Sequence, residues 1–176
     1  MRVLVLGGIR SGKSHWAEAT ISDTAGEPVR YVATGRTDPH RPGLVPARGH
    51  PPQPPAGALV DRRNHRCGNR IARRPAHPPT LVDDIGGWLT ATMDRLDAWT
   101  GGSVRTDVDA LCAAVTGFDG KLTLVSPRWG LTVVPATAGG RLFTDELGTL
   151  NQRLAALCDR VVLVVAGQPL VVKEAR

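Results

Sequence analysis

Aromatic residues, cysteines and long apolar runs are all scarce in this sequence. Aromatic residues make up 4% of the 176 positions. The three cysteines, Cys67, Cys112 and Cys158, are odd in number and far apart, which excludes a disulfide framework and indicates reduced thiols. No run approaches the roughly 20 apolar residues of a membrane span, and the first apolar run is too short for the core of a signal peptide. We therefore expect a cytoplasmic protein without a membrane span.

The basic charge of the sequence is not evenly distributed. The formal net charge is +6, from 22 Lys and Arg against 16 Asp and Glu. Residues 40–76 hold eight of these basic residues and one of the acidic residues, which leaves 14 basic and 15 acidic residues elsewhere. This basic stretch has no aromatic side chain on which a base could stack, although its arginines could contact phosphates. We therefore expect no nucleic-acid partner.

The amino-terminal stretch carries the clearest motif. Residues 3–6 are apolar and rich in Val and Leu, as in a buried parallel strand. Residues 7–14 then read Gly-Gly-Ile-Arg-Ser-Gly-Lys-Ser and fit the phosphate-loop pattern G-x-x-x-x-G-K-[ST]. The glycines allow several backbone N–H groups to converge on a phosphate, Lys13 can reach the outer phosphates, and the Ser14 hydroxyl can ligate Mg²⁺. Residues 15–19 continue as a helix whose N-terminus faces the anion.

Apolar strands alternate with amphipathic helices along most of the remaining chain. We expect strands at 28–34, 80–84, 121–125 and 161–165, the last of these being the final core strand. We expect helices at 86–99, 108–115 and 144–157, the last beginning at a capping Thr144. This alternation predicts an α/β fold of the P-loop NTPase (RecA-like) class, with a mostly parallel sheet flanked by helices, in one domain over 1–176.

Residues 39–79 interrupt this alternation. The stretch holds ten of the fourteen prolines and shows no sustained period of 2 or 3.6. A segment of this length without periodicity is unusual inside a compact domain. We therefore expect an irregular, Pro- and Arg-rich segment without stable packing.

Polar residues at the ends of two predicted strands complete the candidate site. An acid at the end of a strand near a phosphate loop can hold Mg²⁺ or its bound water, and Asp83 is the first candidate, with Asp84 second. Ligands of open α/β sheets bind at the carboxyl ends of the strands, where Thr34 and its neighbours lie, although a turn requiring Gly35 would explain these residues equally well. The expected nucleotide-binding residues are Gly7, Gly8, Ile9, Arg10, Ser11, Gly12, Lys13, Ser14, Thr34, Gly35, Arg36 and Asp83.

Several of these motifs occur together in one known family. The phosphate loop resembles a G-G-x-R-S-G-K-S motif, and residues 31–34, Tyr-Val-Ala-Thr, resemble a Y-[IV]-A-T strand. Residues 151–154, Asn-Gln-Arg-Leu, and 166–169, Ala-Gly-Gln-Pro, make the resemblance specific. The family is that of adenosylcobinamide kinase/adenosylcobinamide-phosphate guanylyltransferase, a cobalamin-assembly enzyme. The similarity covers about residues 1–38 and 80–173.

The resemblance implies two reactions. The first would phosphorylate the aminopropanol hydroxyl of adenosylcobinamide with ATP or GTP, and the second would transfer GMP from GTP to the new phosphate. Lys13 and Asp83 would be catalytic, and Ser14 and Asp83 would hold Mg²⁺. The resemblance also implies a homotrimer and a corrinoid substrate. Alternatives are a P-loop kinase of another small molecule, an inactive frameshifted product, and a nucleic-acid-binding protein.

One part of the family pattern is absent. Before the acidic strand the family carries R-[IV]-x-x-H-R-x-x-R-P-x-x-W-x-T-x-E, whose histidine accepts GMP as a phosphoramidate. No such string stands here; Pro51 occupies the place of that histidine, and His50 is the neighbouring candidate acceptor. Shifting the reading frame of codons compatible with residues 47–72 can restore the motif. We therefore interpret residues from about 40 to 76 as a compensated frameshift, and we expect guanylyl transfer to be impaired in this chain.

Overall fold

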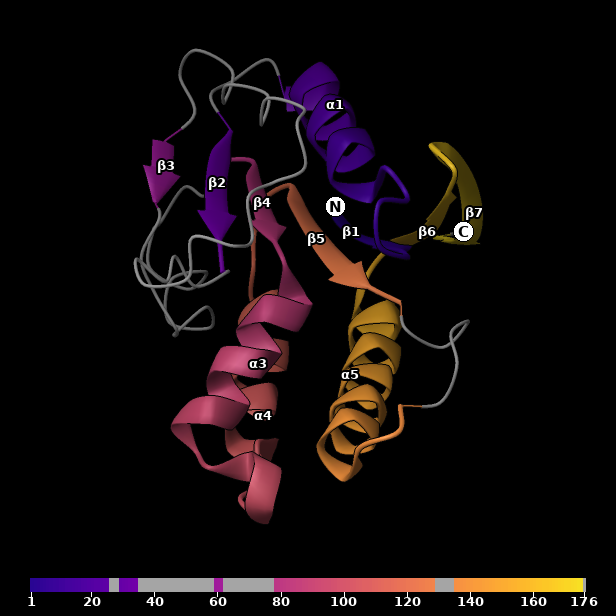
Figure 1. Cartoon of the computed structure of the whole chain (residues 1–176). Helices are drawn as coiled ribbons and strands as arrows, with labels where there is room; N and C mark the ends of the chain where they lie inside the picture. Colours follow the sequence, from indigo (N-terminus) through magenta and orange to yellow (C-terminus); the bar gives the residue numbers. More distant parts are fainter. Residues whose placement is uncertain (26–28, 35–58, 62–77, 129–134, 176) are drawn as a thin grey trace.

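The computed structural model describes residues 1–25, 29–34, 59–61, 78–128 and 135–175. The strands of this part are β1 (Arg2–Gly7), β2 (Arg30–Ala33), β3 (Leu59–Asp61), β4 (Thr80–Asp83), β5 (Leu122–Pro127), β6 (Arg160–Val165) and β7 (Gln168–Glu174). They form one seven-stranded sheet in the order β3-β2-β4-β5-β1-β6-β7 (Figure 1). The first six strands in this order pair in parallel, and β7 pairs antiparallel with β6.

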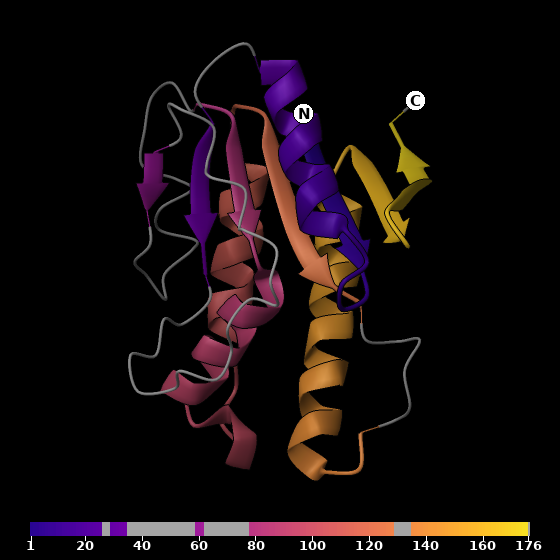
Figure 2. The ribbon, with the colours of Figure 1, turned by 45° about the horizontal axis from the view of Figure 1, so that its top comes forward.

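Helices cover both faces of the sheet. They are α1 (Lys13–Ala25), α3 (Ile85–Arg95), the 3₁₀ helix η1 (Ala98–Thr100), α4 (Arg105–Thr116) and α5 (Ala138–Leu157). Figure 2 shows α1 in front of the sheet and α4 and α5 behind it. None of these helices is both long and apolar enough to cross a membrane.

Each face of the sheet carries one apolar cluster, because successive side chains of a strand point to opposite faces. On β1, Val3 and Val5 pack with Ala17 and Ile21 of α1, whereas Leu4 packs with the helices of the other face. Strand β4 follows the same rule, with Leu81 toward α1 and Val82 toward the other face. Asp83, two residues after Leu81, therefore lies on the α1 face of the sheet.

The structure confirms the predicted α/β class with a mostly parallel sheet. Strand β5 lies between β1, which leads into the phosphate loop, and β4, which ends in Asp83. The strands expected at 28–34, 80–84 and 121–125 are present with shifted ends, as are the helices expected at 86–99 and 108–115.

One expectation at the level of single elements was wrong. Helix α5 begins at Ala138, where Thr137 rather than Thr144 is the cap and accepts a 3.1 Å hydrogen bond from Gly140 N. The strand expected at 161–165 is β6, which has buried side chains, and the Ala166–Gly167 turn leads from it into β7, whose residues are all exposed. Within the segment expected to be irregular, residues 59–61 pair with β2. Their neighbours 39–58 and 62–77 lie outside the described residues.

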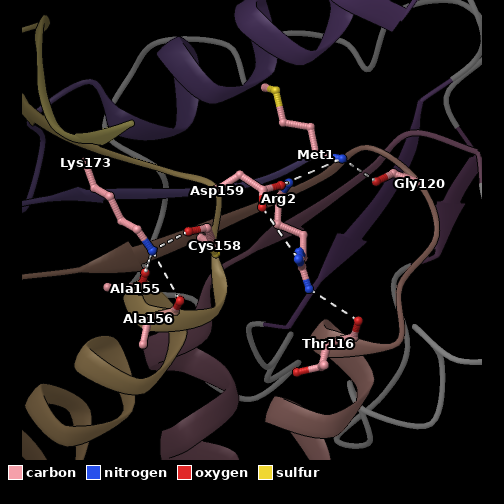
Figure 3. A network of polar contacts seen from close by, with 9 residues as sticks. All are labelled: Met1, Arg2, Thr116, Gly120, Ala155, Ala156, Cys158, Asp159 and Lys173. Carbon is pink, nitrogen blue, oxygen red and sulfur yellow. Dashed lines mark hydrogen bonds and ion pairs between the residues drawn. The ribbon is translucent and has the colours of Figure 1, made fainter. Parts of the chain in front are cut away.

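At the amino-terminal edge of the sheet, polar contacts join β7 to the C-terminus of α5, and the residue before β6 to the start of β1 (Figure 3). The Lys173 ammonium group of β7 donates to the carbonyls of Ala155, Ala156 and Cys158 at 2.9, 3.2 and 2.7 Å. These carbonyls lie at the C-terminus of α5, where the helix leaves acceptors without intrahelical partners and favours a positive charge. Close by, Asp159 accepts a 2.6 Å hydrogen bond from Arg2 N, which holds the pKa of this carboxyl below its usual value.

Replacing Lys173 tests whether this contact stabilises the fold. Lys173→Met keeps a long apolar side chain but removes the charge and the three hydrogen bonds, so we expect a loss of about 1–2 kcal/mol in the free energy of unfolding. The measurement is urea unfolding followed by circular dichroism. Arg105→Met is the control, because Arg105 is 87% exposed and its ion pair with Asp109 spans 4.0 Å. An equal effect of both substitutions would contradict the assigned role of Lys173.

Candidate nucleotide-binding site

The loop between β1 and α1 folds back on itself. Ser11 N donates to Gly8 O at 3.3 Å, and the Lys13 ammonium group donates to the same carbonyl at 3.3 Å. Arg10 and Gly12 adopt positive φ angles of 56° and 88°, which produce the tight curvature of the loop. Because α1 begins at Lys13, the loop is continuous with the N-terminal N–H groups of a helix, an arrangement that binds phosphate.

Ser11 fills the inside of this loop. Its side chain is buried, and its hydroxyl has no hydrogen-bond partner among the residues that the structure describes. A Cβ atom on Gly7 would lie 2.3 Å from this hydroxyl and 2.9 Å from the backbone oxygen of Val164. Gly7 is therefore required at the end of β1 because no side chain fits between the loop and β6.

The turn between β6 and β7 supports the loop from outside. Gly167 N donates to Ser11 O at 2.8 Å. A Cβ atom on Gly12 would lie 3.2 Å from Gly167 Cα, so the two backbones are in close contact. Ala166 and Gly167 have φ angles of 50° and 79°, as a two-residue hairpin turn requires. The sequence analysis used residues 166–169 only for a resemblance and did not identify this contact.

Asp83 lies at the carboxyl end of β4 beside the start of α1. Its carboxylate accepts a 2.9 Å hydrogen bond from the Tyr31 hydroxyl, and Ser14 and Lys13 lie nearby. Burial raises the pKa of Asp83, whereas the Tyr31 hydrogen bond, the Ser14 hydroxyl and the charge of Lys13 oppose the increase. The structure thus brings together the three residues that the sequence named for phosphate and metal, Lys13, Ser14 and Asp83. A hydroxyl and a carboxylate oxygen side by side are suitable Mg²⁺ ligands when phosphate oxygens complete the shell.

Tyr31 and Glu18 also face Asp83, and the sequence analysis did not name either as a site residue. Tyr31 of β2 contacts both Asp83 and Glu18 of α1, and burial is the main reason why its pKa is raised. Burial and the negative charge of Asp83 raise the pKa of Glu18. In the structure Tyr31 pairs with Leu81, and the strand period of 2 places it on the face of Asp83, but this register is not visible in the sequence.

Asp84, the second acidic candidate, serves a different purpose. Its Oδ1 accepts hydrogen bonds from Gly86 N and Gly87 N at 2.6 and 3.3 Å, which makes it the N-cap of α3. The Thr34 hydroxyl accepts a 2.9 Å hydrogen bond from Asp84 N and donates to Asp84 O. Thr34 therefore fixes the backbone at the end of β4. The expected site residues Gly35, Arg36 and His50 lie outside the described residues.

Asn151 of α5 holds the end of β5 beside the loop. Its side-chain oxygen accepts a 2.6 Å hydrogen bond from the Ser126 hydroxyl, and its nitrogen donates to Pro127 O at 3.2 Å. The next residue, Arg128, donates its backbone N–H to Gly7 O at 3.0 Å. A polar contact from α5 thus fixes the strand that separates the phosphate loop from Asp83.

The comparison with known proteins agrees with this geometry. Residues 3–172 match the family model described as cobinamide kinase / cobinamide phosphate guanyltransferase. The chain belongs to this family. The bifunctional adenosylcobalamin biosynthesis protein CobP of Pseudomonas aeruginosa is 32% identical over 178 residues, which are 98% of this chain and 98% of that protein. The bifunctional adenosylcobalamin biosynthesis protein CobU of Escherichia coli is 29% identical over 195 residues, which are 95% of this chain and 97% of that protein.

Membership of the cobinamide kinase / cobinamide phosphate guanyltransferase family confirms the resemblance drawn from the motifs. The match extends across the Pro- and Arg-rich stretch, although the family's histidine motif is not spelled there. The described part of the site supplies the predicted phosphate loop, the oxygen side chains of Ser14 and Asp83 that the sequence analysis expected to hold Mg²⁺, and their supporting contacts. These parts are the ones that phosphoryl transfer needs.

A methyl group at Gly7 tests the packing of the phosphate loop. Gly7→Ala should displace the loop, because the added Cβ overlaps Ser11 and the Val164 backbone, and we expect at least a tenfold loss in nucleotide affinity. The measurement is calorimetric titration with GTP. Gly148→Ala is the control, since a Cβ there meets nothing within 4 Å and favours helix α5. Unchanged GTP affinity in Gly7→Ala would contradict the placement of the nucleotide in this loop.

Proposed function

We propose that this chain is an ATP- or GTP-dependent kinase of adenosylcobinamide built on the guanylyltransferase scaffold of its family. The observation that carries the proposal is the convergence of Lys13, Ser14 and Asp83 at the carboxyl edge of the sheet, where Lys13 and Ser14 lie close enough to Asp83 to act on its pKa. Family membership directs this chemistry toward a corrinoid alcohol. We further propose that residues 1–176 form one kinase/nucleotidyltransferase domain that acts in the cytoplasm.

The kinase step follows from the placement of these groups. Backbone N–H groups of residues 8–14 would bind the phosphates, and Lys13 would lie over the transferred group and balance its developing negative charge. Ser14 and Asp83 would hold Mg²⁺, which neutralises charge on the phosphate oxygens when bound. The aminopropanol hydroxyl of the corrinoid would attack the γ-phosphorus in line with the departing nucleoside diphosphate, ADP or GDP, and its proton would leave to solvent or to a nearby base.

The guanylyl step requires a nucleophile that we place outside the described residues. A histidine nitrogen would attack the α-phosphorus of GTP, with loss of diphosphate, and the corrinoid phosphate would then displace the histidine. In this chain Pro51 occupies the expected place, and His50 would attack from one residue away, about 3.8 Å along the backbone. We propose that this step is impaired and that a compensated frameshift over about 40–76 is the cause.

The exposed strand β7 supports a proposed homotrimer. Its side chains Leu170, Val171 and Val172 are 60%, 43% and 61% exposed. Val165, at the end of β6, is 54% exposed beside them. Apolar side chains gathered on an edge strand are typical of a surface that another chain covers. We propose that copies of this chain cover it.

Loss of the phosphate-loop lysine tests the kinase directly. Lys13→Ala should abolish turnover of ATP and GTP and lower nucleotide affinity, because no other lysine precedes Lys121. The assay incubates cobinamide with Mg²⁺ and each nucleotide and identifies phosphorylated cobinamide by mass spectrometry. Lys121→Ala is the matched control, since Lys121 precedes β5 at the opposite edge of the sheet. Equal product from Lys13→Ala and the wild-type chain would remove the proposed site.

The second reaction has its own test. Incubated with GTP, this chain should form no GMP–protein adduct, whereas a chain in which the shifted frame is restored over about 40–76 should form one. Intact-protein mass spectrometry detects the adduct, and its acid lability and alkali stability identify a phosphoramidate. Resequencing the gene decides the frameshift itself. An adduct mapped to His50 in the unaltered chain would show that guanylyl transfer is intact.

A further inference from the structure

A group of polar side chains lies on the α1 face of the sheet beneath the site. The Tyr31 hydroxyl of β2 donates a 2.9 Å hydrogen bond to Oδ2 of Asp83 of β4. Glu18 and Ser14 of α1 lie near this pair, close enough to act on the pKa values of Tyr31 and Asp83. Ser14 and Glu18 are one helical turn apart on α1, so the helix presents both to the same pair.

The Tyr31 side chain is held on several sides. Its backbone lies in a strand that pairs with β3 on one side and β4 on the other, and its ring packs against the apolar cluster beneath α1. The hydroxyl is therefore at a fixed position relative to β4. A partly buried carboxylate with one oxygen bound to a fixed donor has little freedom to rotate, so its second oxygen keeps one direction.

We propose that Tyr31 is the positioning residue of the metal-binding carboxylate. By holding Oδ2 of Asp83, it directs the other oxygen of that carboxylate toward the metal held beside Ser14. This inference rests on the proposed function, in which Ser14 and Asp83 hold Mg²⁺. Glu18 of α1 lies near the same hydroxyl. Partners of this kind usually affect metal affinity by about 10–100-fold.

The test is Tyr31→Phe, which keeps the ring and removes the hydroxyl. We expect the Mg²⁺ concentration for half-maximal binding of a fluorescent GTP analogue to rise about tenfold, while binding without Mg²⁺ stays unchanged. The Mg²⁺ concentration for half-maximal cobinamide phosphorylation should rise in parallel, with a much smaller change in kcat at saturating Mg²⁺. Thr92→Val is the control, because it removes a buried hydroxyl that bonds within α3 to Trp88 O.

The Asp83→Asn variant distinguishes failure of this inference from failure of the proposed metal site. If Asp83→Asn raises the Mg²⁺ requirement and Tyr31→Phe does not, the inference is wrong and the proposed metal site remains. If neither substitution raises it, the metal assignment in the proposed function fails, and the inference fails with it. If Thr92→Val raises it as much as Tyr31→Phe, the effect is one of stability, and the positioning role is refuted.

A second measurement needs no substitution at Tyr31. The chain contains one tyrosine, so growth on 3-fluorotyrosine labels this ring alone. Adding Mg²⁺ to the protein already bound to nucleotide should shift the single fluorine resonance, and Asp83→Asn should abolish the shift. A resonance that does not move with Mg²⁺ would overturn the inference even if Tyr31→Phe failed to fold.

Discussion

Parallel pairing of β5 with both β1 and β4 fixes the distance between the phosphate loop and the Asp83 carboxylate. Gly7 pairs with Pro127, and Asp83 pairs with Val125, so the two strand ends lie two strand spacings, roughly 10 Å, apart across the sheet and are offset by two residues along the strands. Ser14, at the start of α1, lies on the Asp83 side of this gap. The site therefore exists only when the central sheet is assembled in this register.

Strand β7 connects this functional edge of the sheet to the opposite, structural edge. At the carboxyl edge its turn donates from Gly167 N to Ser11 O, and at the amino edge Lys173 binds the last carbonyls of α5. Helix α5 in turn fixes the end of β5 through Asn151. A change in the packing of β7, for example against another copy of the chain, would thus act on a strand that contacts the phosphate loop.

The sequence predicted the elements whose residues carry their own local signal. The glycines and Lys13 define the phosphate loop without reference to the remaining fold, and the apolar run before Asp83 identifies an acidic strand. Long-range contacts were not predictable in this way. Asp83 and Asp84 are adjacent acids in the sequence. Only the packing of α1 on one face of the sheet and the start of α3 show that Asp83 faces the phosphate loop whereas Asp84 caps α3. Strand β7 was missed because Ala166 gives no turn signal and Pro169 argues against a strand. Helix α5 was shortened because Gly139 and Gly140 have low helix propensity.

The measurement that tests the central claim most directly is the location of the metal in a crystal of the protein with a non-hydrolysable GTP analogue and Mn²⁺. The account predicts one anomalous peak at about 2.1 Å from the Ser14 hydroxyl, with Asp83 in contact directly or through one water, and the outer phosphates inside residues 7–14. A metal bound away from Asp83, or phosphates outside this loop, would contradict it.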